Sequence, residues 1–405
     1  MLSRRTLLGG IGSGTLLAPF GASFALANAP TDRRLVIVIL RGALDGLAAV
    51  PPYADPEYRR IRGTLALPEN DGILDLNGRF GLHPALAPLQ ALYSVGEMTA
   101  LHAVATPYRS RSHFDAQDIL ENGVTGARER KDGWLNRALG LMGGERLGLA
   151  VGQSVPLILR GEMPVASWAP PEMPAADIDF LSRLAALYAH DAVLGPALDQ
   201  GLRAQAMADD ALGDPREGQG RMSGERMYGR APRSQPLSKT AQAVGRLLAA
   251  RDGARVAVME LGGWDTHANQ GALTGQLNNR LRDLGEGLAA LKPALGQAWR
   301  RTAVAVVTEF GRTVAVNGTN GTDHGTGAAA FLLGGAITGG RVIAHWPGLG
   351  AHQLYEGRDL APTLDLRSVM KALLIDHLGL PAGDVERIVF PGSREAAPLR
   401  DTLRV

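Results

Sequence analysis

The feature that most constrains the fold is a strand–helix–strand pattern in the C-terminal half of the chain. "ARVAVMEL" (254–261) and "TAVAVVT" (302–308) are continuous apolar runs, as in strands that are buried on both faces. Between them, leucines recur every three or four residues from 273 to 295, which predicts a long amphipathic helix. This order is typical of a parallel sheet with right-handed crossovers. We therefore predict a three-layer α/β/α sandwich with a mostly parallel central sheet.

Other segments extend this pattern. Further strands are predicted at 34–40, 97–105, 154–161, 328–335 and 341–346. Helices are predicted at 175–205, which is rich in Ala and Leu, and at 365–381, which begins with an Asp N-cap and ends with Gly-Leu-Pro. Residues 206–239 are polar and punctuated by Gly and Pro, which indicates a surface insertion, mobile loop or lid. Residues 28–405 are thus predicted to form one domain.

The N-terminus has the pattern of a twin-arginine export signal. Arg4 and Arg5 precede a weakly hydrophobic stretch, and Ala25-Leu26-Ala27 offers a small-x-small cleavage site. The glycines and the proline in this stretch disfavour a membrane-spanning helix. We predict that residues 1–27 are a signal peptide read by the twin-arginine machinery. The mature protein would then be periplasmic or otherwise exported, with no integral membrane segment.

Composition excludes several classes of function. The chain has no cysteine, so disulfides, thiolate nucleophiles and cysteine metal sites are excluded. Without Arg4 and Arg5, 40 basic residues balance 40 acidic residues. This balance argues against nucleic acid as a partner, because nucleic-acid binding needs a dominant positive field. Any metal ion must be held by imidazole, carboxylate or hydroxyl groups.

Polar side chains follow four of the predicted strands. Ligands of parallel sheets bind beyond the carboxyl ends of the strands. The candidates are Asp45 after 34–40, Ser112 and His113 after 97–105, Asp265 and His267 after 254–261, and Glu309 after 302–308, with Asp323 and His324 at the end of the following loop. Because these ends share one edge of the sheet, the sequence predicts a metal site there.

Each candidate also has a local alternative. Asp45 and Ser112 could simply cap the helices that follow them. Glu309 could pair with Arg312 in a surface turn, and the glycine-rich segment 308–327 could be a plain hairpin. Asp323 and His324 are harder to explain as a turn. Their flanking glycines let the backbone approach a ligand closely, and histidine has no special preference for turns.

The predicted ligand types indicate the chemistry. Carboxylates and imidazoles without thiolates suit zinc, manganese, magnesium or calcium. One or two ions are possible, and two ions about 4 Å apart could hold the attacking and leaving oxygens of a phosphoryl or sulfuryl transfer. Ser112 at a helix N-terminus suits a nucleophile, and Arg111 or Arg312 suits an anion-holding group. The predicted substrate is a small anionic ester or a polyanion.

Five motifs carry a resemblance to a known family. "RGALDGL", "SHFDAQDILENG", "GGWDTH", "TEFGRT" and "GTDHGTG" stand behind the twin-arginine signal. This combination resembles the exported bacterial family called domain of unknown function 1501. The family is usually placed beside the alkaline phosphatase and sulfatase superfamily. The resemblance therefore implies an alkaline-phosphatase-like sandwich with a metal centre at the carboxyl edge of the sheet.

The resemblance also implies roles for individual residues. Ser112 would be the nucleophile, and the metal ligands would be Asp45, Asp265, His267, Glu309 and His324. Phe310 stands where the superfamily often has a histidine ligand, which leaves open whether His113 or Asp323 substitutes for it.

Two functions remain open at this point. One is a metal-dependent hydrolase of phosphate or sulfate esters. The other is a catalytically degenerate member of the fold that acts as a periplasmic binding or assembly protein. An oxidoreductase is disfavoured, because no strand is followed by a G-x-G-x-x-G turn.

Overall fold

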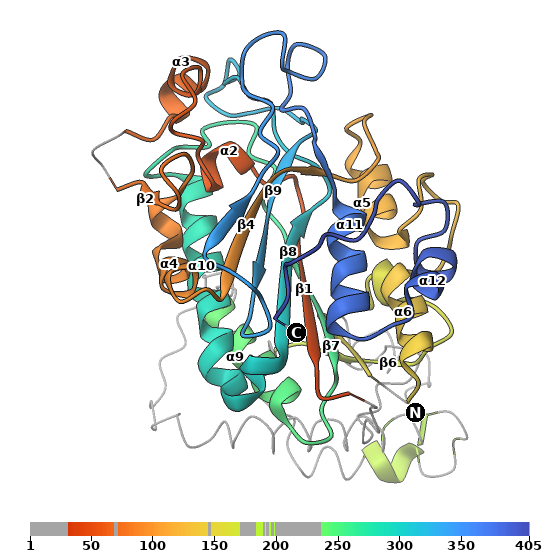
Figure 1. Ribbon diagram of the computed structural model, residues 1–405. Coiled ribbons are helices and arrows are strands. Elements are labelled where there is room, and N and C mark those ends of the chain that lie inside the picture. Colours follow the sequence, from red (N-terminus) through yellow and green to blue (C-terminus); the bar gives the residue numbers. More distant parts are fainter. Residues whose placement is uncertain are drawn as a thin grey trace, which may run out of the picture.

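A single large sheet forms the centre of the molecule (Figure 1). The computed structural model describes residues 31–68, 72–144, 147–170, 184–188, 191, 194, 195, 198 and 236–404. The sheet has nine strands in the order β10-β4-β9-β8-β1-β7-β5-β6, with β11 also paired to β4. Their bounds are β1 (Arg34–Leu40), β4 (Met98–Ala105), β5 (Gly148–Val151), β6 (Val165–Trp168), β7 (Val256–Leu261), β8 (Thr302–Thr308), β9 (Ala328–Leu333), β10 (Arg341–Ile343) and β11 (Leu364–Asp365). A separate hairpin joins β2 (Leu74–Asp75) to β3 (Gly81–Leu82).

The sheet is mostly parallel. The central strand β1 pairs in parallel with β7 on one side and β8 on the other, so Leu40 lies opposite Leu261 and Thr308. Among the described strands of this sheet, β9 alone runs against its neighbours, pairing antiparallel with both β4 and β8. The carboxyl ends of β1, β4, β7 and β8 and the amino end of β9 therefore lie at the same edge.

Helices cover both faces of the sheet (Figure 1). α4 (Ala87–Ser94), α9 (Leu237–Ala249) and α10 (Gln276–Leu295) lie on one face, and α5 (His113–Asn122), α6 (Trp134–Met142), α11 (Leu366–Ala372) and α12 (Ala382–Asp384) lie on the other. The short helices α2 (Gly46–Ala49) and α3 (Tyr58–Arg62) follow β1. Alternate residues of β1 enter different cores: Val36 and Val38 pack with α9 and α10, whereas Leu35 and Ile37 pack with α6 and α11. This two-sided burial confirms the predicted three-layer α/β fold.

Most predicted elements in the described region are confirmed. The runs at 34–40, 97–105, 254–261, 302–308, 328–335 and 341–346 contain β1, β4, β7, β8, β9 and β10, and the leucine repeat forms α10. The predicted helix at 365–381 begins as α11, capped by the Asp365 side chain, and continues as a π-helical turn over Leu373–His377.

The predicted strand at 154–161 is wrong. This part of the chain forms a 3₁₀ turn at Leu157–Leu159, and the strands lie on either side of it, in β5 and β6. Pro156 cannot donate to a strand ladder, and the apolar residues that suggested a strand instead fill the core, where Ile158 and Leu159 are buried.

Three expectations fall mainly outside the described residues. These are the signal peptide at 1–27, the helix at 175–205 and the insertion at 206–239, of which only 236–239 are described, at the start of α9. No helix in the described ranges combines the length and apolar character needed to cross a bilayer.

Candidate metal centre

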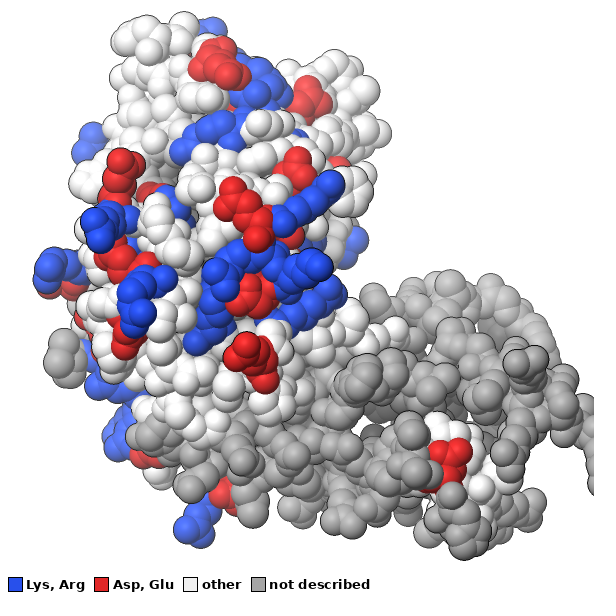
Figure 2. Space-filling model, turned by 90° about the vertical axis from the view of Figure 1, so that its right-hand side faces the viewer, with Lys and Arg blue, Asp and Glu red and all other residues white. Residues whose placement is uncertain are grey.

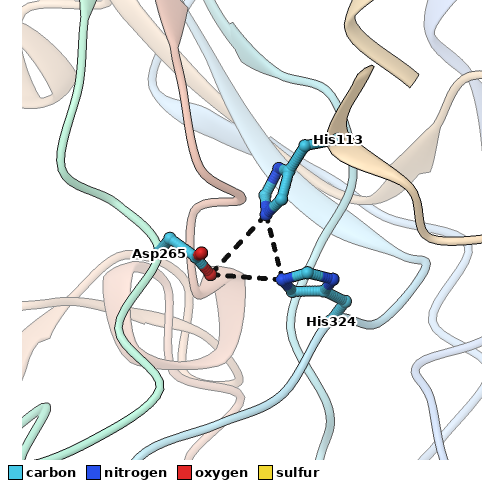
Figure 3. A group of neighbouring side chains, drawn as sticks. All are labelled: His113, Asp265 and His324. Carbon is cyan, nitrogen blue, oxygen red and sulfur yellow. Dashed lines mark hydrogen bonds and ion pairs between the residues drawn. The ribbon is translucent and has the colours of Figure 1, made fainter. Parts of the chain in front are cut away.

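Three side chains from distant loops meet at the carboxyl edge of the sheet (Figure 3). His113 opens α5 after β4, Asp265 lies in the loop after β7, and His324 precedes β9. One donor atom from each lies within 4.8 Å of the other two. The loops that the sequence predicts at one edge are therefore brought together, as the shared direction of β4 and β7 and the reversal of β9 require.

The spacing of the donor atoms suits a shared cation. His324 Nε2 lies 3.0 Å from His113 Nε2 and 3.3 Å from Asp265 Oδ1, and His113 Nε2 lies 3.6 Å from that oxygen. His267 Nε2 lies 2.9 Å from both Asp265 Oδ1 and His324 Nε2. Ligands about 2.0–2.1 Å from a tetrahedral zinc ion lie about 3.3 Å from one another. The observed spacings are close to this value.

Each of the three imidazoles is backed by an oxygen acceptor at Nδ1. Glu309 Oε1 lies 2.7 Å from Nδ1 of His113, the Arg111 carbonyl lies 3.0 Å from that of His324, and Asp323 Oδ1 lies 3.2 Å from that of His267. These acceptors assign the proton of His113 and of His324 to Nδ1, which leaves Nε2 of both rings with a lone pair. His267 has a carboxylate oxygen beside each ring nitrogen, Asp323 Oδ1 at Nδ1 and Asp265 Oδ1 at Nε2. The donor atoms of His113, Asp265 and His324 thus all face one another, and His267 adjoins this group through Asp265 and His324.

Glu309 holds His113 rather than joining the donor group. It is 1% exposed, and its carboxylate accepts from His113, from Gln117 Nε2 at 3.0 Å and from the Gly42 N–H at 2.8 Å. Burial raises the pKa of Glu309, but the hydrogen bonds from His113 and Gln117 hold the pKa below its ordinary value. In turn, the bond to Glu309 raises the pKa of His113, so His113 Nε2 binds a cation, whether a metal ion or a proton, more strongly.

Arg312 orients Asp265. Its side chain is fully buried, and its guanidinium contacts Asp265 Oδ1, the Thr322 hydroxyl and the Thr322 carbonyl. Burial raises the pKa of Asp265, whereas the hydrogen bond and charge of Arg312 lower it, and the net pKa lies below the ordinary value. Asp265 therefore stays ionised beside the imidazoles.

Phe310 packs against two of the imidazoles. It is buried, and its ring centroid lies 4.7 Å from that of His113 and 5.3 Å from that of His324. Of the two residues considered as substitutes for a histidine at position 310, His113 contributes a donor atom to the group. Asp323 instead contacts Nδ1 of His267.

Asp45 is not among the donors. Its carboxylate is 1% exposed, accepts from the Ala48 N–H as the N-cap of α2, and contacts Arg62 and Gln270. Gln270 in turn accepts from the hydroxyls of Thr266 and Thr322, 2.8 Å away in each case. The capping alternative is thus the observed one, and the charge of Asp45 is balanced by Arg62.

Ser112 occupies the N-cap position of α5, directly before His113, but its hydroxyl makes no capping hydrogen bond. The capping alternative is therefore not realised for Ser112. Arg111, the preceding residue, donates to Asp359 at 2.7 Å and to Glu356 at 2.5 Å. Both arginines that the sequence suggests for anion binding are consequently engaged by carboxylates of the protein itself.

Several contributing residues escaped the sequence analysis. Gln117 lies four residues after His113, and this helical spacing, which puts the two on one face of α5, is a signal that could have found it. Arg62, Gln270, Asp359 and the Arg111 carbonyl reach the site only through tertiary structure, so no local pattern indicates them.

The surroundings carry mixed charge. In Figure 2, basic and acidic side chains are interspersed over the described part of one face of the molecule. In the helical layer of α11 and α12, Arg367 pairs with Asp365 and Arg387 with Asp384. A hollow of about 250 Å³ lies beside the loop after β7, lined by Met259, Arg280 and Leu284 among others, and none of the donor residues lines it.

The fold and the site define an α/β protein with a candidate metal centre at the carboxyl edge of its sheet. Residues 92–389 match the family described as "Protein of unknown function (DUF1501)", and the chain belongs to this family. No curated protein sequence matches the chain.

Three solved structures with a similar course of the chain are distant from it in sequence. The C-terminal periplasmic domain of EcEptC from Escherichia coli, in complex with Zn, is 12% identical, covers 92% of this chain and 91% of its own, and gives a TM-score of 0.40. The phosphonate monoester hydrolase SpPMH from Silicibacter pomeroyi is 11% identical, with coverages of 91% and 76% and a TM-score of 0.37. The PsFucS1 sulfatase from Pseudoalteromonas sp. is 12% identical, with coverages of 92% and 74% and a TM-score of 0.36. At these TM-scores the likeness carries no information about activity.

Proposed function

We propose that this protein is an exported hydrolase of phosphate or sulfate esters that depends on one divalent metal ion. The convergence of the imidazole Nε2 atoms on Asp265 Oδ1 is the observation that carries the proposal. His113, Asp265, His267 and His324 would hold the ion. Three nitrogens and one oxygen suit zinc, whereas magnesium and calcium prefer oxygen ligands alone.

We propose one ion rather than two because the Asp45 carboxylate is already paired with Arg62. A second ion near this carboxylate would have to displace the Arg62 guanidinium, which is fully buried and also donates to the carbonyl of Val314 at 3.2 Å. The protein thus supplies its own positive charge at this place.

The chemistry would combine the ion with the start of α5. A divalent ion bound there stabilises negative charge that develops on the ester. Ser112 presents a hydroxyl without a capping hydrogen bond at the N-terminus of α5, whose dipole favours an anionic group. In the first step the bond from Ser112 Oγ to phosphorus or sulfur forms, the bond to the alcohol breaks, and the serine proton ends on the alcohol. Water then hydrolyses the serine ester and restores the hydroxyl.

Metal content tests the central claim. We expect the mature protein, purified after export from its native host, to contain one divalent ion per chain by mass spectrometry, and His324→Ala to contain none. His345→Ala is the matched control, because His345 is an exposed histidine outside the donor group. Metal-free wild-type protein would overturn the proposal.

The role of Ser112 is tested separately. Ser112→Ala should keep its metal ion but lose at least about 10³-fold in kcat on a phosphate or sulfate ester, because the residual rate then rests on binding and charge stabilisation alone. Equal rates for Ser112→Ala and wild type would show that Ser112 is not the nucleophile.

A second candidate function is a periplasmic binding or assembly protein that has lost catalysis. The engagement of Arg111 by Asp359 and of Arg312 by Asp265 favours it, since neither guanidinium is then free to hold an anionic substrate. Full metal occupancy without turnover of any phosphate or sulfate ester would select this alternative.

A further inference from the structure

Arg111 has an unusual backbone conformation. Its φ is +61°, in the left-handed region that strains residues with a side chain, and it stands directly before Ser112 and His113. Such strain persists only where the surrounding structure enforces it, and it is concentrated at functional sites.

The segment from Tyr355 to Asp359 holds Arg111 in place. Arg111 Nε donates to Asp359 Oδ2 at 2.7 Å, and its guanidinium lies 5.8 Å from the ring centroid of Tyr355. Asp359 is fully buried, and its other carboxylate oxygen has no hydrogen-bond partner among the described residues. The Asp359 main chain is fixed by hydrogen bonds in both directions with Tyr355, so this anchor does not shift easily.

The main-chain carbonyl of Arg111 contacts the metal centre. It accepts from His324 Nδ1 at 3.0 Å and so leaves Nε2 of His324 as the free donor. The same segment reaches His324 from the other side, because Arg358 Nη2 donates to the His324 carbonyl at 2.7 Å. The direction of the Arg111 carbonyl depends on the backbone angles of Arg111, whose side chain is held by Asp359.

We propose that Asp359 and Arg111 are positioning residues of the metal centre: the buried Asp359 carboxylate keeps Arg111 in the left-handed conformation, and the Arg111 carbonyl then orients the His324 ring toward the ion. This inference rests on the proposed metal site. It assigns Arg111 a role different from the anion binding that the sequence suggests, and it gives Asp359, a residue without a sequence signal, a function.

Two substitutions of Arg111 separate the backbone from the side chain. Glycine adopts positive φ without strain, so Arg111→Gly keeps the carbonyl direction but loses the guanidinium. Arg111→Ala loses the guanidinium and relaxes the backbone. We expect zinc affinity, measured on the full mature chain by competition with a chromophoric chelator, to fall about 10–100-fold in Arg111→Ala and to stay within about threefold of wild type in Arg111→Gly.

Asp359→Asn tests the anchor, and we expect a similar 10–100-fold loss of zinc affinity. Glu356→Gln is its matched control. Glu356 is the exposed partner of Arg111, and an exposed ion pair contributes little, so zinc affinity should not change. If Asp359→Asn does not fold, the comparison of Arg111→Gly with Arg111→Ala decides. The visible spectrum of the cobalt-substituted protein gives a second readout, which should differ from wild type in Arg111→Ala and Asp359→Asn but not in Arg111→Gly or Glu356→Gln.

The outcomes separate this inference from the proposed function. If wild type binds zinc and Arg111→Ala and Asp359→Asn bind it equally well, the positioning role is overturned while the metal centre stands. If Arg111→Gly loses as much affinity as Arg111→Ala, the guanidinium itself matters and the backbone argument fails. If wild type binds no zinc, both proposals fall.

Discussion

At the scale of single residues, the site is defined by how each donor is held. Glu309, Asp323 and the Arg111 carbonyl fix three imidazoles, and Arg312 fixes Asp265. An ion in such a site meets ligands that are already oriented, because partners of this kind set both tautomer and ring direction. Asp45, which carries the same kind of charge, is instead neutralised within the protein.

The buried pair of Asp45 and Arg62 predicts a large effect on stability. Arg62→Met would leave the Asp45 carboxylate at 1% exposure without a cation, and breaking a buried pair costs about 3–5 kcal/mol. We expect this loss in the free energy of unfolding, measured by urea denaturation. Arg60→Met, two residues away on α3, removes an exposed pair with Glu57 and should change stability by less than about 1 kcal/mol. Equal effects of the two substitutions would contradict this account.

How much of the site could be predicted from the sequence also depends on individual residues. His113, Asp265 and His324 could be placed at one edge because each follows or precedes a recognisable strand, although their role as ligands stays a prediction. Capping of α2 by Asp45 could be predicted as an alternative, but the neutralisation of its charge could not. It depends on Arg62, whose guanidinium reaches Asp45 only once α3 has packed over the end of the sheet.

At the scale of elements, the long apolar runs gave the clearest predictions. β1 and β8 are seven residues long and buried on both faces, so their apolar runs are unambiguous. β5 and β6 have four residues each, and such short runs cannot be distinguished from apolar turns by periodicity. The apolar turn at Leu157–Leu159 was therefore mistaken for a strand, while its neighbours were missed.

The contact between α9 and α10 depends on glycine. A Cβ added to Gly245 would lie 2.6 Å from the Cβ of Ala294, which cannot rotate away. Gly245→Ala should gain about 1 kcal/mol in helix propensity but lose about 1–3 kcal/mol to overpacking, so we expect a net loss of stability of about 1 kcal/mol in urea denaturation.

Gly140 in α6 provides the control for this prediction. A Cβ there would meet only the Met163 side chain, at 3.7 Å. Gly140→Ala should therefore stabilise the protein by up to about 1 kcal/mol. Stabilisation by both substitutions would show that the two helices can move apart at no cost.

At the scale of the whole molecule, the two apolar cores on opposite faces of the sheet explain why the fold class could be predicted from the sequence. Alternate residues of β1 enter different cores, so the residues on both faces of this strand are apolar. The connection through α10 sets the parallel direction of the strands that it joins.

The stability of the whole fold should depend on pH through His377. This residue is buried, its Nε2 donates to the Arg34 carbonyl at 2.8 Å, and burial lowers its pKa from 6.5 to about 4. In the unfolded chain the pKa returns to about 6.5, so the unfolded state binds the proton first as pH falls. The contribution of His377 to the free energy of unfolding is thus complete above pH 6.5 and is lost as pH falls toward 4.

We expect a contribution of about 2 kcal/mol to be lost between pH 7 and pH 5. The measurement is urea denaturation at both pH values, for wild type and for His377→Gln, which keeps a donor but does not titrate in this range. The variant should lose about 2 kcal/mol less than wild type over the interval. The same pH dependence in both proteins would rule out His377 as its source.

The reversal of β9 has a consequence for how proteins of this architecture can diverge. The chain leaves the sheet at the end of β8 and re-enters it at the start of β9 on the same side, so residues 309–327 form a closed excursion. Insertions or deletions within this excursion would change how far Asp323 and His324 extend without altering the register of any strand. Ligand preference could therefore diversify through changes near Asp323 and His324, while Glu309, Arg312 and the sheet are inherited unchanged.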